Sequence, residues 1–78
     1  MTSVKKLISI LIPAYNEEEV LGMLFERLDK LAESTSDYAF EFLFVNDGSR
    51  DKTYEIIRNK AEKDPRVSYI NLSRNFGK

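Results

Sequence analysis

Two hydrophobic patterns alternate along this chain of 78 residues, and this alternation limits its possible folds more than any other feature. Short runs of aliphatic, β-branched and aromatic residues at 7–12, 40–45 and 67–72 have the length and composition of strands. The segments between them, 20–32 and 51–64, repeat their apolar residues at helical spacing. The order β-α-β-α-β predicts one α/β unit, with a parallel sheet and right-handed helical connections.

The first strand and helix carry further signals. The run at 7–12 is continuous and ends at Pro13, which is typical of a parallel strand covered on both faces. Asn16 stands three residues before Glu19, so we expect Asn16 to cap a helix whose first turn holds three consecutive glutamates. The apolar face of that helix comprises Val20, Leu21, Leu24, Phe25, Leu28, Leu31 and Ala32.

The second helix has its own start and stop signals. Asp51 is the expected cap, and the helix should end near Asp64, because a residue that precedes proline resists the helical conformation.

The first strand would have an open outer edge in this arrangement. An uncovered edge invites self-association, so we expect marginal stability and dimers or aggregates.

Charge and composition exclude several classes of function. Twelve Lys and Arg against thirteen Asp and Glu give a net charge of −1, which provides no general attraction to nucleic acid or to an anionic membrane. Cysteine and histidine are absent, so the chain builds no disulfide, no Ser-His-Asp triad and no histidine-ligated metal site. The apolar run at 7–12 is too short for a signal peptide or a membrane span.

Polar segments follow each of the three strands, at 13–17, 46–49 and 73–78. Ligands of open parallel sheets bind outside the carboxyl ends of the strands, so these segments are the candidate site. The first segment has neither a dinucleotide-binding G-x-G-x-x-G nor a P-loop. A ligand would more plausibly place its base and ribose against Tyr15, Glu17 and Asp47. Its phosphates would then meet Arg74 and Lys78, an arrangement that suits a nucleoside diphosphate.

Structural alternatives exist for each of these residues. Asn, Asp, Gly and Ser are ordinary turn formers, and Asp47 can serve as a turn residue or as a cap for the second helix. Tyr15 can pack instead of stacking on a base. Glu17 and Glu18 favour a helix N-terminus whatever else they do.

Three stretches of the chain resemble the inverting glycosyltransferases of family 2, and in particular its polyprenyl-phosphate branch. These stretches are Ile12-Pro13-Ala14-Tyr15-Asn16-Glu17-Glu18, Val45-Asn46-Asp47-Gly48-Ser49-Arg50-Asp51-Lys52-Thr53 and Leu72-Ser73-Arg74-Asn75-Phe76-Gly77-Lys78. The resemblance covers nearly the whole chain and keeps the three motifs in order. It implies that residues 1–78 are an incomplete nucleotide-sugar-binding domain, the N-terminal part of a Rossmann-like GT-A fold.

The resemblance also implies site residues and an activity. Pro13, Tyr15, Glu17 and Asp47 would line the nucleoside pocket, with Asp47 reading the base, and Arg74 and Lys78 lie in the stretch that approaches the donor diphosphate. The parent protein would transfer a sugar from a nucleotide donor, expected to be a UDP-sugar, to a polyprenyl phosphate at the cytoplasmic face of a membrane. It would contact that membrane through regions outside this chain. Many family members have an acid where this chain has Asn46, so the role of Asn46 stays open.

The resemblance places the metal-binding D-x-D motif and the catalytic base beyond the third strand. Mg²⁺ or Mn²⁺ is expected for the parent, but no D-x-D occurs in these 78 residues, so we assign no catalytic and no metal-binding residue here. A non-catalytic nucleotide-binding module is the main alternative function. A receiver-like signalling domain is another, but that fold needs acids directly after the first strand, where this chain has Pro13-Ala14-Tyr15-Asn16.

Overall fold

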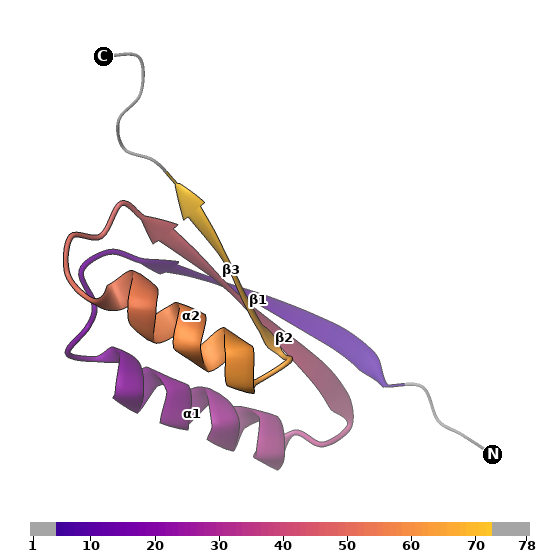
Figure 1. The fold of residues 1–78 in the computed structure, drawn as a ribbon. Coiled ribbons are helices and arrows are strands. Elements are labelled where there is room, and N and C mark those ends of the chain that lie inside the picture. The colour runs from indigo at the N-terminus through magenta and orange to yellow at the C-terminus, as the bar shows by residue number, and fades with distance from the viewer. Residues whose placement is uncertain (1–4, 73–78) are drawn as a thin grey trace.

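A computed structural model of the protein describes residues 5–72, which form three strands and two helices (Figure 1). In chain order the elements are β1 (Lys6–Ala14), α1 (Leu21–Ser34), β2 (Tyr38–Asp47), α2 (Thr53–Lys63) and β3 (Val67–Leu72). The predicted order β-α-β-α-β is confirmed. No helix among residues 5–72 is long and apolar enough to cross a membrane.

The sheet is parallel, with β2 between β1 and β3. The β1–β2 register runs from Lys6 opposite Tyr38 to Ala14 opposite Asn46. The β2–β3 register places Asn46 opposite Asn71. The last residues of the three strands therefore lie in one row, at the carboxyl edge of the sheet.

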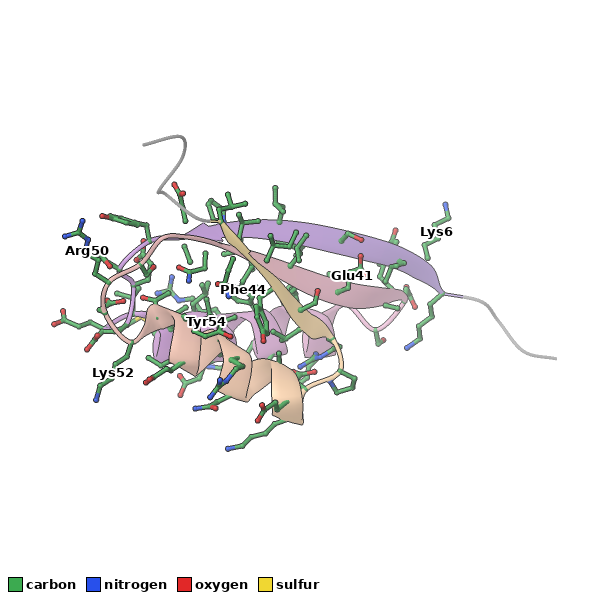
Figure 2. The ribbon with its side chains drawn as sticks, turned by 45° about the horizontal axis from the view of Figure 1, so that its top comes forward. Lys6, Glu41, Phe44, Arg50, Lys52 and Tyr54 are labelled. Atoms are coloured by element: carbon green, nitrogen blue, oxygen red, sulfur yellow. The ribbon has the colours of Figure 1, made fainter. Side chains whose placement is uncertain are left out.

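Both helices cover the same face of the sheet, and the core lies between them and the strands (Figures 1 and 2). Alternate residues of β2 point into this layer, where Phe42 and Phe44 are almost fully buried. Leu21 of α1 and Ile57 of α2 are also buried. The rings of Phe25 and Phe44 pack edge to face, with 5.5 Å between centroids. This packing holds the helix starts near the carboxyl edge.

The opposite face of the sheet is uncovered among the described residues, so the prediction that the first strand is covered on both faces is wrong here. Leu7 and Leu11 are 58% and 64% exposed, while Ile8, Ile10 and Ile12 pack against the helix-covered core. The strand also continues through Pro13 to Ala14, which an edge strand tolerates because the missing N–H need not serve a second neighbour. β1 is an edge strand of the sheet, and the predicted self-association through its open edge stays a prediction.

The start of α1 also differs from the prediction. Asn16 does not cap it: the helix begins at Leu21, and a turn closed on the carbonyl of Glu17 precedes it. The first turn of α1 holds no acidic residue. For α2 the prediction is wrong by one residue, since Lys52 is the N-cap, but the carboxylate of Asp51 does accept the N–H of Thr53 at 2.9 Å. The helix ends at Lys63, before Asp64 and Pro65, as predicted.

Arg66 organises an ion-pair network at the amino end of β3. Its guanidinium donates to Asp64 at 2.7 and 3.0 Å and to Asp29 of α1 at 2.7 Å. Lys60 of α2 lies 3.8 Å from both of these carboxylates. Hydrogen bonding from Arg66 lowers the pKa of Asp64 below its ordinary value. The network thus joins both helices to the beginning of β3.

Candidate functional site

The loops after β1 and β2 meet at the carboxyl edge of the sheet, as the sequence predicted for two of its three polar segments. The β1–α1 loop, 15–20, begins directly after Ala14, and the β2–α2 loop, 48–52, directly after Asp47. Ala14 and Asn46 are register partners, so the two loops leave the sheet side by side. The third polar segment, 73–78, lies outside the described residues.

Asn16 is one link between the two loops. Its N–H donates to the hydroxyl of Ser49 at 2.9 Å, and its side-chain oxygen accepts the N–H of Arg50 at 2.8 Å. The backbone φ of Asn16 is 52°, a left-handed value that asparagine tolerates better than most residues. Its side chain therefore serves the neighbouring loop instead of the helix that follows it.

Thr53 and Asp51 provide further links. The hydroxyl of Thr53, which is fully buried, accepts the N–H of Glu17 at 2.7 Å, and Asp51 accepts the N–H of Glu18 at 3.2 Å. In return Glu18 accepts the N–H of Lys52 at 2.9 Å. Desolvation acts to raise the pKa of Asp51, but hydrogen bonds from Thr53 and Glu18 hold it below its ordinary value.

Asn46, whose role the sequence left open, is a buried connector. It is 5% exposed, and its amide nitrogen donates to the side-chain oxygen of Asn71 at 2.9 Å. Its own side-chain oxygen accepts the N–H of Ser49 at 3.3 Å and the hydroxyl of Ser49 at 2.5 Å. Sequence reasoning did not identify this contact, because Asn46 and Asn71 are 25 residues apart and their pairing depends on strand register.

The structure brings together four of the six predicted nucleotide-binding residues. Pro13 lies next to the end of β1, and Tyr15, which is 46% exposed, follows that strand. Glu17 is a half-buried residue of the β1–α1 loop, and Asp47 is the half-buried last residue of β2. The other two, Arg74 and Lys78, lie outside the described residues. Nucleotide binding by all six stays a prediction.

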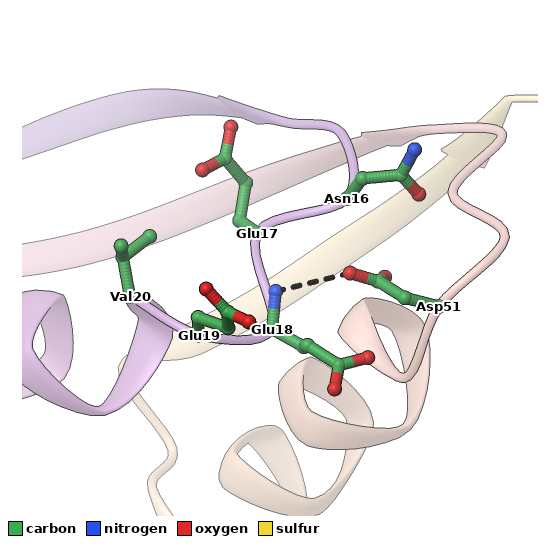
Figure 3. Close-up of a pocket in the computed structure, with 6 residues that line it drawn as sticks. All are labelled: Asn16, Glu17, Glu18, Glu19, Val20 and Asp51. Carbon is green, nitrogen blue, oxygen red and sulfur yellow. Dashed lines mark hydrogen bonds between the residues drawn. The ribbon is translucent and has the colours of Figure 1, made fainter.

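An acidic hollow of about 430 Å³ lies beside these loops (Figure 3). The residues that line it are Asn16, Glu17, Glu18, Glu19, Val20 and Asp51. Four of these six carry carboxylates and none carries a positive charge, so the lining disfavours a diphosphate. The phosphates of a nucleotide would therefore have to lie outside this hollow.

The described residues do not fit a divalent cation. Within residues 5–72 no group of three or more His, Cys, Asp or Glu side chains is placed to hold a metal ion. The carboxylates around the hollow are partly committed to backbone N–H groups, as Asp51 and Glu18 show. No chemical step that needs a cation can be assigned to this part of the chain.

Comparison with known proteins defines the class. Residues 9–78 match the family described as Glycosyl transferase family 2, which covers most of the chain. The chain belongs to this family. The matched range includes the loops after β1 and β2, which meet at the carboxyl edge of the sheet. The resemblance noted from the sequence motifs is confirmed.

Individual relatives agree with this class. The chain is 48% identical over 69 residues to the uncharacterized glycosyltransferase YkcC of Bacillus subtilis, covering 88% of this chain and 21% of the relative. It is 46% identical over 72 residues to the putative glycosyltransferase CsbB of the same species, covering 92% of this chain and 22% of the relative. A prophage bactoprenol glucosyl transferase homolog of Escherichia coli is 41% identical over 71 residues, covering 91% of this chain and 23% of the relative. The chain therefore spans less than a quarter of the length of these relatives.

Proposed function

We propose that this chain is the nucleoside-binding portion of an inverting glycosyltransferase, which transfers a sugar from a UDP-sugar to a polyprenyl phosphate. The family match supports a glycosyltransferase. The relatives named bactoprenol glucosyl transferase support a polyprenyl-phosphate acceptor, since bactoprenol is a polyprenol. Because the chain spans 21% to 23% of these relatives, we place the complete activity in a longer protein.

The arrangement of the first two loops is the observation that carries this proposal. Tyr15 and Glu17 on one loop and Asp47 on the neighbouring strand end lie together at the carboxyl edge, where ligands of parallel sheets bind. A tyrosine ring provides a face for the base, and a carboxylate accepts a hydrogen bond from a base N–H or a ribose hydroxyl. Arg74 and Lys78 would supply positive charge for the diphosphate.

The cation and the catalytic base belong, in this proposal, to other parts of the longer protein. Within residues 5–72 no group of acidic side chains is placed to hold Mg²⁺ or Mn²⁺. The acceptor is a lipid phosphate, so we also propose that the protein acts in cell-envelope synthesis at the cytoplasmic face of a membrane. Contact with that membrane would use regions outside residues 1–78.

A non-catalytic nucleotide-binding module is the second candidate, favoured by the same lack of a metal ligand set among the described residues. Transfer assays separate the two functions. The 78-residue chain and the full-length protein are each incubated with UDP-sugar, polyprenyl phosphate and Mg²⁺ or Mn²⁺. We expect transfer by the full-length protein only. Transfer by the short chain would contradict the proposed division, and nucleotide binding without transfer by the full-length protein would favour the module.

A further inference from the structure

A continuous chain of hydrogen bonds, most of them between side chains, crosses the carboxyl edge of the sheet. We call its four members, Asn71, Asn46, Ser49 and Asn16, the edge relay. Asn46 donates to Asn71, Ser49 donates to Asn46 through its hydroxyl, and the N–H of Asn16 donates to that hydroxyl. The side-chain oxygen of Asn16 then accepts the N–H of Arg50. The relay thus connects the end of β3 with both loops of the candidate site.

Side chains supply the hydrogen bonds that join Asn16, Glu17 and Glu18 to the second loop and the start of α2. Among the described residues, no backbone-to-backbone hydrogen bond joins residues 15–20 to residues 48–52. The hydrogen bonds that Asn16 and Glu18 make with residues 49–52 each use a side chain, and the hydroxyl of Thr53 at the start of α2 adds a bond to Glu17. The spacing between the loops therefore depends on these side chains, whereas the spacing of the strands depends on the backbone ladder.

Two of the relay residues, Asn16 and Asn46, are sequence neighbours of predicted nucleotide-binding residues. Asn16 lies between Tyr15 and Glu17, and its left-handed backbone sets the directions in which these neighbours leave the loop. Asn46 immediately precedes Asp47. A shift in the relay would move the two sides of the nucleoside site relative to each other.

We propose that Asn16 and Asn46 are positioning residues, which hold Tyr15, Glu17 and Asp47 at the spacing that a nucleoside diphosphate requires. This inference rests on the proposed function. Neither asparagine need touch the nucleotide, because each acts through the residues beside it. A misplacement of about 1 Å at a binding or reacting group is enough to cost up to about a hundredfold in function.

The chemistry of the relay defines a conservative change and a disruptive one. Asn46→Asp keeps an acceptor for Ser49, and Asn71 can rotate its amide to donate to the new carboxylate. Asn46→Asp combined with Asn71→Asp places two carboxylates about 3 Å apart with no donor between them, where like charges repel. The single change should therefore preserve the relay and the double change should break it.

Asn16→Gly removes only the last bond of the relay, from the N–H of Arg50 to the Asn16 side chain, and keeps the bond from the N–H of residue 16 to Ser49, with little risk to folding. Glycine adopts the observed φ of 52° without strain, so the backbone path survives while the acceptor for Arg50 is lost. Asn59→Gly is the matched control. Asn59 is exposed in the middle of α2, away from the relay, and glycine there should lower stability by about 1 kcal/mol through helix propensity alone.

The test measures UDP affinity by calorimetry and thermal stability for each variant of the full-length transferase. We expect Asn16→Gly and the double aspartate variant to weaken UDP binding by about tenfold. Asn46→Asp should stay close to wild type, and Asn59→Gly should lower the melting temperature without changing the affinity. Amide exchange in the 78-residue chain should show faster exchange at Arg50 in Asn16→Gly.

Three distinct results would overturn the inference. If wild type binds UDP and both Asn16→Gly and the double aspartate variant bind it equally well, the positioning role is wrong while the proposed function stands. If wild type does not bind UDP, the proposed function fails and the positioning role fails with it. Equal losses of affinity in Asn59→Gly and Asn16→Gly would show that general stability, not positioning, controls binding.

Discussion

The two ends of the sheet are held together by different chemistry. At the amino end of β3, the charged side chain of Arg66 joins Asp64 and Asp29. At the carboxyl edge, neutral amides and hydroxyls form most of the contacts, and Ser49, Thr53 and Asn16 each accept a backbone N–H from across the two loops. The amino end fastens helices to a strand, and the carboxyl edge fixes the spacing of loops.

This difference separates a structural region from a candidate site. Arg66 also lies over the ring of Phe42, 5.5 Å from its centroid, so its charge and its planar face both contact the protein itself. At the carboxyl edge, Tyr15 is 46% exposed and stands where a ligand can approach. Substitutions at the amino end should therefore change stability, and substitutions at the carboxyl edge should change binding.

The largest expected effect is on nucleotide binding by Asp47. If Asp47 accepts a hydrogen bond from the base, as proposed, Asp47→Ala in the longer protein should weaken binding by about 10- to 150-fold, the equivalent of about 1.5–3 kcal/mol. Asp47→Asn is the sharper variant, since its amide donates on one side where a carboxylate only accepts. Affinity and melting temperature are measured together. Unchanged affinity with a lower melting temperature would identify Asp47 as a turn residue.

Thr53→Val should produce the next largest effect, a decrease in the free energy of unfolding of the 78-residue chain. Valine has nearly the same shape, but it leaves the N–H of Glu17 without its 2.7 Å acceptor. An unsatisfied N–H costs about 1–3 kcal/mol when it is shielded from water. Urea denaturation measures the loss, and Thr53→Ser, which keeps the hydroxyl, is the control. Equal losses in both variants would point to the methyl group instead.

Arg66→Met tests the amino end. The change removes the bonds to Asp64 and Asp29 and should lower the free energy of unfolding by about 1–2 kcal/mol. This value is smaller than for a fully buried ion pair, because solvent partly screens these side chains. UDP affinity of the full-length transferase should not change. A loss of affinity comparable to that of Asp47→Ala would break the division between the two ends of the sheet.

The smallest effect is a pH dependence that originates at Asp64. Hydrogen bonding from Arg66 lowers the pKa of the Asp64 carboxyl group in the folded state. Asp64 therefore contributes its full stabilisation above the pKa of the unfolded chain, about 3.9, and this stabilisation is lost as the pH falls through the lower pKa of the folded state. Stability measured from pH 6 to pH 2.5 should decline over the acidic part of this range. Asp64→Asn should reduce that slope, and an unchanged slope would assign the decline to other carboxylates.

Much of the fold could be predicted from local pattern. The third strand has the predicted bounds, Val67–Leu72, and α2 ends before Asp64 because Pro65 follows it. The apolar face of α1 was predicted through Leu21 and Leu24, which pack in the core, although Val20 and Leu31 of the same pattern are 47% and 40% exposed. Periodicity identifies a helix face more reliably than it identifies its edges, because neighbouring elements decide how much of the face is covered.

The sequence alone determined the order of the elements, the parallel sheet and the class of the protein, because these depend on hydrophobic runs and motifs that are local in the chain. The tertiary structure alone decided how the polar residues after the strands are used. Asn16 looks like a helix cap within its own segment, but Arg50, 34 residues away, offers its side chain a different partner. Asn46 likewise became a connector only when strand register placed Asn71 beside it. Such contacts depend on register and loop closure, which no local pattern of residues specifies.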